Sequence, residues 1–122
     1  MAVKRIVANI ETTDPASVAS FYSNLLGLET VMDHGWINTL QGAEQQSIQL
    51  SAASQGGSDT PVPALSIEVD DLEEVHARAV SLGIVIEYGP VNEPWGVRRF
   101  YVRDPAGTLI NILTHAPQES AN

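Results

Sequence analysis

The sequence contains two similar halves, and this internal repeat limits the possible folds more than any other feature. Leu26 and Gly27 recur as Leu82 and Gly83, 56 positions further along the chain. In each half an apolar run precedes an aspartate and an amphipathic run follows it, which predicts a strand followed by a helix. A chain of 122 residues with this pattern is expected to form one domain from two copies of a small unit.

Each half is predicted to contain one strand, one helix and three further strands. Asp14 is suited to cap the first helix, Pro15 to begin it and Gly27 to end it. The second helix begins with acidic residues, which favour the positive end of the helix dipole, and ends before Gly83. The predicted helices span residues 15–26 and 71–82. The predicted strands span residues 4–10, 28–33, 36–41 and 46–52 in the first half, and 63–69, 84–88, 97–103 and 108–114 in the second.

The segment between the halves has no apolar period and is rich in Ser, Gly and Pro, which is typical of a linker. The chain is therefore divided into a first module (1–53), a linker (54–62), a second module (63–115) and a tail (116–122). The predicted fold class is α+β, with two tandem βαβββ modules. A ferredoxin-like α+β domain is the alternative, but it needs fewer strands than the sequence indicates.

The chain is acidic, with 15 acidic and six basic residues and a formal net charge of −9. This charge disfavours binding to nucleic acid and favours cationic small molecules, although a generally soluble acidic protein is the simpler explanation of the charge. No apolar run is long enough to cross a membrane, and the N-terminus lacks the features of a signal peptide. The absence of cysteine excludes thiolate chemistry and is consistent with the expected cytoplasmic location.

Two motifs occur in order along the chain. The first is Asp14-Pro15 followed by residues 21–29 (FYSNLLGLE), and the second is residues 95–107 (WGVRRFYVRDPAG) followed by residues 108–113 (TLINIL). Together they resemble the two halves of the vicinal oxygen chelate superfamily, which includes glyoxalase I, bleomycin-resistance proteins and extradiol dioxygenases. The resemblance covers nearly the whole chain. It implies curled mixed sheets around a cup-shaped cavity, whereas an ordinary antiparallel sheet would leave its second face to solvent.

The same resemblance implies a metal site that takes one His or Glu from each of four strands. These positions correspond to Val7, Gln49, Ala64 and Asn111. Aliphatic side chains cannot coordinate a metal and neutral amides are weak ligands for Zn²⁺ or Fe²⁺, so neither a metal nor another cofactor is expected. The three histidines share no ligand spacing and are predicted to be surface residues: His34, His76 and His115.

The remaining candidate residues are suited to binding. Trp36, at the start of a strand, and Trp95, in the loop predicted at residues 90–96, can stack on aromatic or cationic ligands, or else pack in the core or a dimer interface. Arg99 and Tyr101 share a strand face and can bind a carboxylate or phenol, although pairing with surface acids is the alternative for the arginine. The predicted binding residues are Asn9, Trp36, Gln49, Ser66, Trp95, Arg99, Tyr101 and Asn111.

No catalytic residue is assigned by the sequence. Glu11 and Glu68 occupy equivalent strand positions and can act as an acid–base pair only if their pKa values differ, so surface acids at strand ends are the simpler interpretation. No nucleophile elbow or phosphate-binding loop is present.

The leading hypothesis is a metal-independent small-molecule binding protein that resembles the bleomycin-resistance branch and sequesters an aromatic or cationic compound. The alternative is a lyase or dioxygenase-like enzyme of the same family that acts on a small metabolite. We also expect a homodimer, because cups in this family close by pairing halves within one chain or across two chains.

Overall fold

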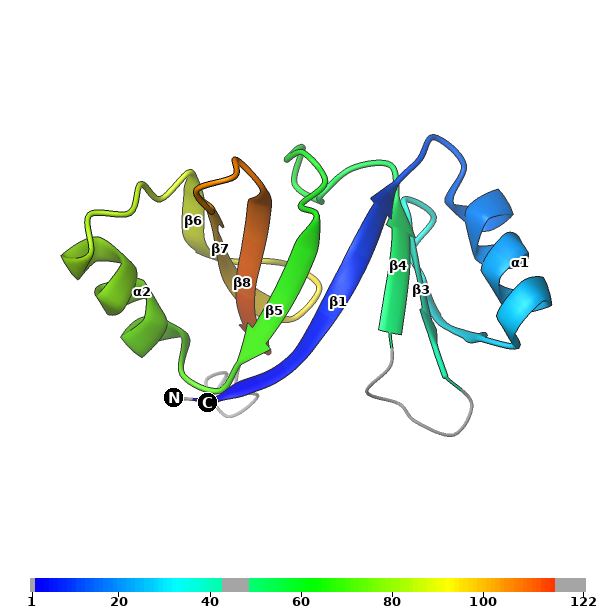
Figure 1. Cartoon of the computed structure of the whole chain (residues 1–122), viewed down its shortest axis with the longest axis horizontal. Helices are drawn as coiled ribbons and strands as arrows, with labels where there is room; N and C mark the ends of the chain where they lie inside the picture. The colour runs from blue at the N-terminus through cyan, green and yellow to red at the C-terminus, as the bar shows by residue number, and fades with distance from the viewer. Residues whose placement is uncertain (1, 43–48, 116–122) are drawn as a thin grey trace. The chain divides into compact units, whose positions relative to one another are not determined.

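The computed structural model describes residues 2–42 and 49–115 (Figure 1). Within these residues the element order is strand, helix and three strands, and this order occurs twice. The predicted α+β fold with repeated βαβββ modules is therefore confirmed. Neither described helix has the length and apolar character needed to cross a membrane.

The chain forms two compact units, and the first strand contributes to both. We call residues 7–65 the N-terminal unit, and residues 1–6 together with residues 66–122 the C-terminal unit. Part of the predicted fourth strand (residues 46–48) and the predicted tail (residues 116–122) lie outside the described residues.

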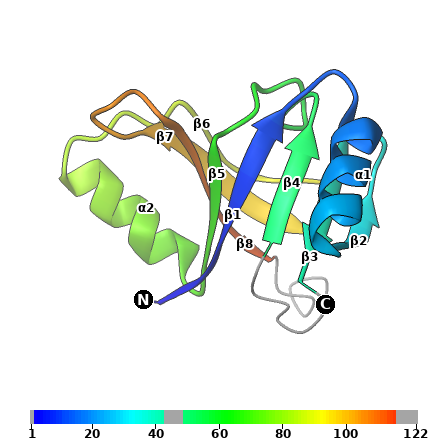
Figure 2. The same cartoon turned by 45° about the vertical axis from the view of Figure 1, so that its right-hand side comes forward.

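In the N-terminal unit one helix packs on a four-stranded arrangement. Strand β1 (Val3–Glu11) pairs in parallel with β4 (Gln49–Ala53). Strand β4 pairs antiparallel with β3 (Ile37–Gln41), which pairs antiparallel with β2 (Glu29–Asp33). Helix α1 (Pro15–Leu26) packs against β3 and β4, and Figure 2 shows it beside β4.

In the C-terminal unit the strand order is β5–β8–β7–β6. These strands are β5 (Leu65–Val69), β6 (Tyr88–Asn92), β7 (Val97–Arg103) and β8 (Leu109–His115). Helix α2 (Leu72–Ser81) packs against β7 and β8. The core beneath it contains Phe100 and Val69 from the strands and Leu72 and Ala79 from the helix.

The ends of the helices follow from the capping residues. Asp14 Oδ1 accepts a hydrogen bond from the backbone N–H of Ser17 at 3.1 Å, and Gly27 has a φ of 73°, so the prediction of residues 15–26 is confirmed. The second helix begins one residue later than predicted. Asp71 caps it through a 3.1 Å hydrogen bond from the N–H of Glu74.

The predicted strand at residues 84–88 is wrong, and the observed strand is β6 at Tyr88–Asn92. Residues 84–87 have the β-branched composition of a strand but connect α2 to β6. In the sequence, Pro90 argues against a strand at residues 88–92, because proline has no backbone N–H to donate to a neighbouring strand. The structure tolerates it because β6 is the edge strand of this unit.

The apolar helix faces predicted from helical spacing are correct only in part. Of the predicted stripe of α2, Ala79 is buried and Val75 packs against the core, whereas Leu82 is 68% exposed because it lies past the last helical turn. The predicted stripe of α1 includes Phe21 and Leu25, but both are exposed, and the buried positions are Pro15 and Ala19.

The segment predicted as a linker contains a hydrogen-bonded turn. The N–H of Gly56 donates to the carbonyl of Thr60 at 2.7 Å, and the Thr60 hydroxyl donates to the carbonyl of Gly57 at 2.7 Å. All three of these residues are buried. This turn is therefore part of the folded N-terminal unit.

Candidate functional site

The sheet of the C-terminal unit has one apolar and one polar face. Phe100 pairs with Ile112 in the register of β7 and β8, and Tyr101 pairs with Asn111. Because strand side chains alternate, Phe100 faces the helix and Tyr101 the opposite side, which it shares with Arg99 as predicted. We call this second side the polar face and define it by five residues: Ser66, Glu68, Arg99, Tyr101 and Asn111.

The centre of the polar face is a buried ion pair. Arg99 Nε lies 2.7 Å from Glu93 Oε2, and each side chain is only 3% exposed. The Tyr88 hydroxyl donates to the same carboxylate oxygen at 2.8 Å, and Arg99 Nη1 donates to the Tyr101 hydroxyl at 3.0 Å. The charge of Arg99 is therefore balanced inside the protein, by a buried acid and not by a surface acid as in the predicted alternative.

Three aromatic rings surround the guanidinium of Arg99. Its Cζ atom lies 4.9 Å from the ring centroid of Tyr101, 5.1 Å from that of Trp95 and 5.4 Å from that of Tyr88. These distances are within the range of cation–π attraction. The arginine therefore fixes the position of the Trp95 indole, which is half-buried.

The loop that carries Trp95 is also held by its own backbone. The N–H of Glu93 donates to the carbonyl of Val97 at 2.7 Å, and the N–H of Gly96 donates to the carbonyl of Glu93 at 3.1 Å. The loop is shorter than the predicted 90–96, since its first residues belong to β6. A short bonded loop keeps the indole in one position.

Two further predicted binding residues contact each other on the polar face. Asn111 Nδ2 donates to the Ser66 hydroxyl at 3.1 Å. Asn111 Oδ1 is buried and accepts no hydrogen bond within the described residues. An unsatisfied buried acceptor costs about 1–3 kcal/mol, so this oxygen favours a donor N–H or O–H at this position.

The other three predicted binding residues lie in the N-terminal unit. Asn9 is the register partner of Ser51, whose hydroxyl is bonded to that of Thr39 at 2.8 Å in the interior. Gln49 Nε2 donates to Gln41 Oε1 at 3.4 Å. The Trp36 ring stacks on His34 with a centroid distance of 6.3 Å. The side chains of Gln49 and Trp36 are therefore in contact with neighbours in the same unit.

The four positions predicted to correspond to the family's metal ligands carry poor ligands for a metal. Val7 and Ala64 offer no donor atom, and the amides of Gln49 and Asn111 are bonded to neighbouring side chains. Among the described residues no group of three His, Cys, Asp or Glu side chains could hold a metal. The residues present therefore do not fit the family's metal.

We predict that the purified protein carries no stoichiometric transition metal, because Val7, Gln49, Ala64 and Asn111 supply no charged or imidazole ligand. Elemental analysis checks this directly. About one Zn, Ni, Mn or Fe per chain that survives chelator would contradict the prediction.

Glu68 is buried, so its interpretation as a surface acid is wrong, whereas Glu11 is exposed. Glu68 Oε1 lies 2.6 Å from Arg5 Nε, and Glu68 Oε2 lies 2.7 Å from His115 Nδ1. Burial raises the pKa of Glu68, but the hydrogen bond to His115 and the charge of Arg5 outweigh it. The pKa of Glu68 therefore lies below the ordinary value of 4.5.

This lowered pKa predicts a loss of stability in acid. A glutamate in the unfolded chain binds a proton more readily than Glu68 does in the folded chain. The ionised Glu68 therefore stabilises the folded chain at pH values above the ordinary glutamate pKa. That stabilisation disappears as the pH falls below about 4.5. We expect Glu68→Gln to be less stable than the wild type near neutral pH and less sensitive to acid. Urea unfolding from pH 7 to pH 3 checks this, with the exposed Glu11→Gln as the control. Equal acid sensitivity of Glu68→Gln and the wild type would contradict it.

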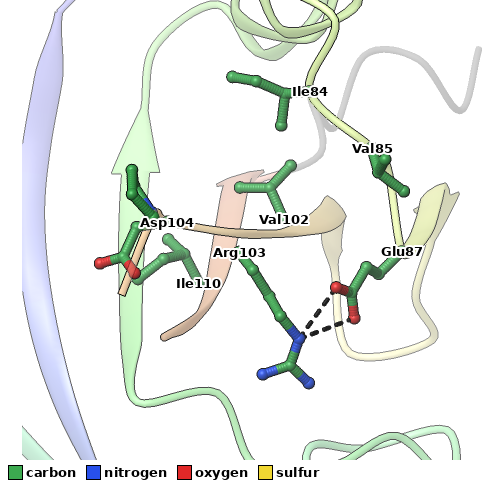
Figure 3. Close-up of a pocket in the computed structure, with 8 residues that line it drawn as sticks. Ile84, Val85, Glu87, Val102, Arg103, Asp104 and Ile110 are labelled. Carbon is green, nitrogen blue, oxygen red and sulfur yellow. Dashed lines mark hydrogen bonds and ion pairs between the residues drawn. The ribbon is translucent and has the colours of Figure 1, made fainter. Parts of the chain in front are cut away.

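The structure also contains a pocket of about 610 Å³ in the C-terminal unit (Figure 3). It opens on the helix side of the sheet, where Val102 of β7 pairs with Ile110 of β8. At the edge of the pocket, Arg103 Nε donates to Glu87 Oε2 at a distance of 2.9 Å. None of the predicted binding residues lines it. Its lining residues are Ile84, Val85, Glu87, Val102, Arg103, Asp104, Pro105 and Ile110.

Sequence reasoning missed Glu93, Tyr88 and the partnership of Glu68 with His115. Glu93 lies two residues before Trp95, just ahead of the second motif, and this proximity was the only sign of the ion pair in the sequence. Tyr88 was predicted to end a strand at residues 84–88, whereas in the structure it begins β6. Glu68 and His115 are 47 residues apart, so only the alignment of β5 and β8 brings them together.

The sequence model of the Glyoxalase/Bleomycin resistance protein/Dioxygenase superfamily matches residues 5–112. The chain belongs to this superfamily. The repeated βαβββ modules agree with this assignment. The four predicted metal-ligand positions carry no His or Glu in this chain: Val7, Gln49, Ala64 and Asn111.

Solved structures show the same fold at low sequence identity. One is described as an NAD-dependent benzaldehyde dehydrogenase from Legionella pneumophila, with 19% identity, a TM-score of 0.72 and coverage of 90% of this chain and 98% of that one. Another is methylmalonyl-CoA epimerase from Mycobacterium tuberculosis, with 21% identity, a TM-score of 0.65 and coverage of 98% and 91%. A superfamily member from Vibrio splendidus 12B01 has 17% identity, a TM-score of 0.64 and coverage of 93% and 99%. No curated protein matches the chain.

Proposed function

We propose that the protein is a metal-independent small-molecule binding protein that holds a flat aromatic ligand on the polar face, beside Trp95. The observation that carries this proposal is the Arg99–Glu93 ion pair surrounded by three aromatic rings. It fixes a half-buried indole in place, which supports stacking on a planar ligand. Asn111 Oδ1 adds an acceptor for a ligand N–H or O–H.

The charge of the site favours a cation over an anion. Glu93 balances the charge of Arg99, so the arginine no longer favours a ligand carboxylate. The net charge of −9 adds a long-range attraction for cations. Sequestration of a planar, cationic compound, as in the bleomycin-resistance branch that the chain resembles, is the proposed role.

The test is a fluorescence titration in a Trp36→Phe variant, in which Trp95 is the single tryptophan. The matched probes are 9-aminoacridine, a planar cation, and acridine-9-carboxylate, a planar anion of similar size. The cation is expected to quench Trp95 and to bind about tenfold more tightly, a difference of about 1.4 kcal/mol. If only the anion binds, the cationic-ligand proposal fails and a carboxylate-bearing metabolite replaces it.

A homodimer is part of the proposed function. Large apolar side chains on the surface of α1 support it: Phe21, Leu25 and Leu26 are each more than half exposed. Contiguous apolar surface of this kind is typical of an interaction site. We expect sedimentation at micromolar concentration to give the mass of two chains, and Leu25→Glu to shift it toward one. A monomer under these conditions would contradict the prediction.

A further inference from the structure

We propose that His115 and Glu68 form a proton-accepting dyad, in which the imidazole is a general base and the carboxylate positions it. The substrate class is a compound with an activated C–H bond next to an electron-withdrawing group. This inference adds a chemical step to the proposed binding function and does not depend on the binding of a cationic ligand.

The geometry first determines which nitrogen of the imidazole carries the proton. His115 Nδ1 lies 2.7 Å from Glu68 Oε2. An ionised carboxylate can only accept hydrogen bonds, so Nδ1 is the donor and carries the proton. In the neutral imidazole Nε2 then holds the lone pair that accepts a proton.

The carboxylate is held in its ionised form by a second partner. Arg5 Nε lies 2.6 Å from Glu68 Oε1, the oxygen that does not bond to His115. Glu68 is buried, while the side chain of Arg5 is 31% exposed. The side chains that act on Glu68 are Arg5 and Lys4 from β1, through their charges, and His115 from β8, through its hydrogen bond. All three favour the ionised carboxylate, and the hydrogen bond keeps the imidazole in one orientation.

The imidazole itself is open to solvent, unlike its partner. The His115 side chain is 53% exposed, and among the described residues its only polar contact is made through Nδ1. Here one nitrogen is fixed by a carboxylate and the other remains available, which is the arrangement of a general base.

The position of His115 in the sheet places it near the stacking residue. His115 pairs with Val97 in the register of β7 and β8, and Val97 directly follows the loop that carries Trp95. The dyad and the indole therefore lie at the same end of the sheet.

The experiment uses 5-nitrobenzisoxazole as a probe of proton abstraction by the full chain. The base takes the proton from ring carbon 3, the C–H electron pair completes a carbon–nitrogen triple bond, and the N–O bond breaks to release a coloured phenolate. The imidazolium then returns its proton to water, so no further reactant is needed. The wild type is expected to accelerate this reaction above the same concentration of free imidazole.

His115→Gln is expected to reduce the rate by about 100-fold, while the control variants His34→Gln and His76→Gln retain it. Glu68→Gln should lower the rate and remove the preference for the Nδ1–H tautomer in nitrogen-15 NMR spectra, and Glu68→Asp should restore part of both. A wild type no faster than imidazole would overturn the proposal. A His115→Gln rate within about twofold of the wild type would also overturn it. The exposed His115 site makes loss of folding a poor explanation, and thermal unfolding of the variant checks this.

Discussion

Arg99→Met is expected to destabilise the protein by about 3–5 kcal/mol, because it leaves the Glu93 carboxylate buried without its counter-charge. Both side chains are almost fully enclosed, so water cannot replace the lost partner. The Tyr88 hydroxyl remains as a donor to Glu93, but a neutral donor does not balance the charge. Urea unfolding at neutral pH measures the effect.

The control is the exposed pair of Arg103 and Glu87, whose side chains are 46% and 35% exposed. Arg103→Met is expected to change the free energy of unfolding by less than about 1 kcal/mol, since surface pairs are weak. The double variant Arg99→Met with Glu93→Leu should recover much of the lost stability, because no buried charge is left alone. Equal effects of Arg99→Met and Arg103→Met would contradict the buried-pair interpretation.

Phe100→Ala is expected to have a comparable effect, about 3–5 kcal/mol, through a cavity in the core under α2. Phe100 is 1% exposed and packs with Val69, Leu72 and Ala79. The edge of the His76 ring also contacts it, with a centroid distance of 5.3 Å. Truncation removes contacts on both the helix and the strand side of this core.

The matched control is Phe21→Ala on the exposed side of α1, where the ring is 58% exposed. Its expected effect is within about 0.5 kcal/mol, apart from any change in dimerisation. Thermal unfolding of the two variants at equal protein concentration makes the comparison. Similar losses for Phe100→Ala and Phe21→Ala would mean that the core under α2 does not dominate stability.

Elements with local signals were predicted closely from the sequence. Helix α1 was predicted with its observed bounds because Asp14, Pro15 and Gly27 each act within one turn of the chain. Strand β7 was also predicted with its observed bounds. Strand β6 was missed because a proline is acceptable only at a sheet edge, and strand order is a property of the tertiary fold.

The candidate site was predictable only to the level of strand faces. Alternation along β7 placed Arg99 and Tyr101 together and apart from Phe100, and the structure confirms this arrangement. Side-chain alternation could not reveal that Glu93 balances the charge of Arg99, because Glu93 lies in a loop that folds back on β7. Contacts between distant strands, such as that of Glu68 with His115, depend on register and leave no local signal.

Binding of a planar ligand on the polar face beside Trp95 can be mapped by NMR. Nitrogen-15 labelled protein is titrated with 9-aminoacridine, and shifts of the indole N–H, side-chain amide and backbone amide signals are followed. We predict the largest shifts at the Trp95 indole and the Asn111 side-chain amide, and little change at the backbone amides of Ile84 and Val85. Shifts concentrated at Ile84 and Val85 would place the ligand in the pocket on the helix side and contradict the claim. The absence of any shift at Trp95 would contradict it as well.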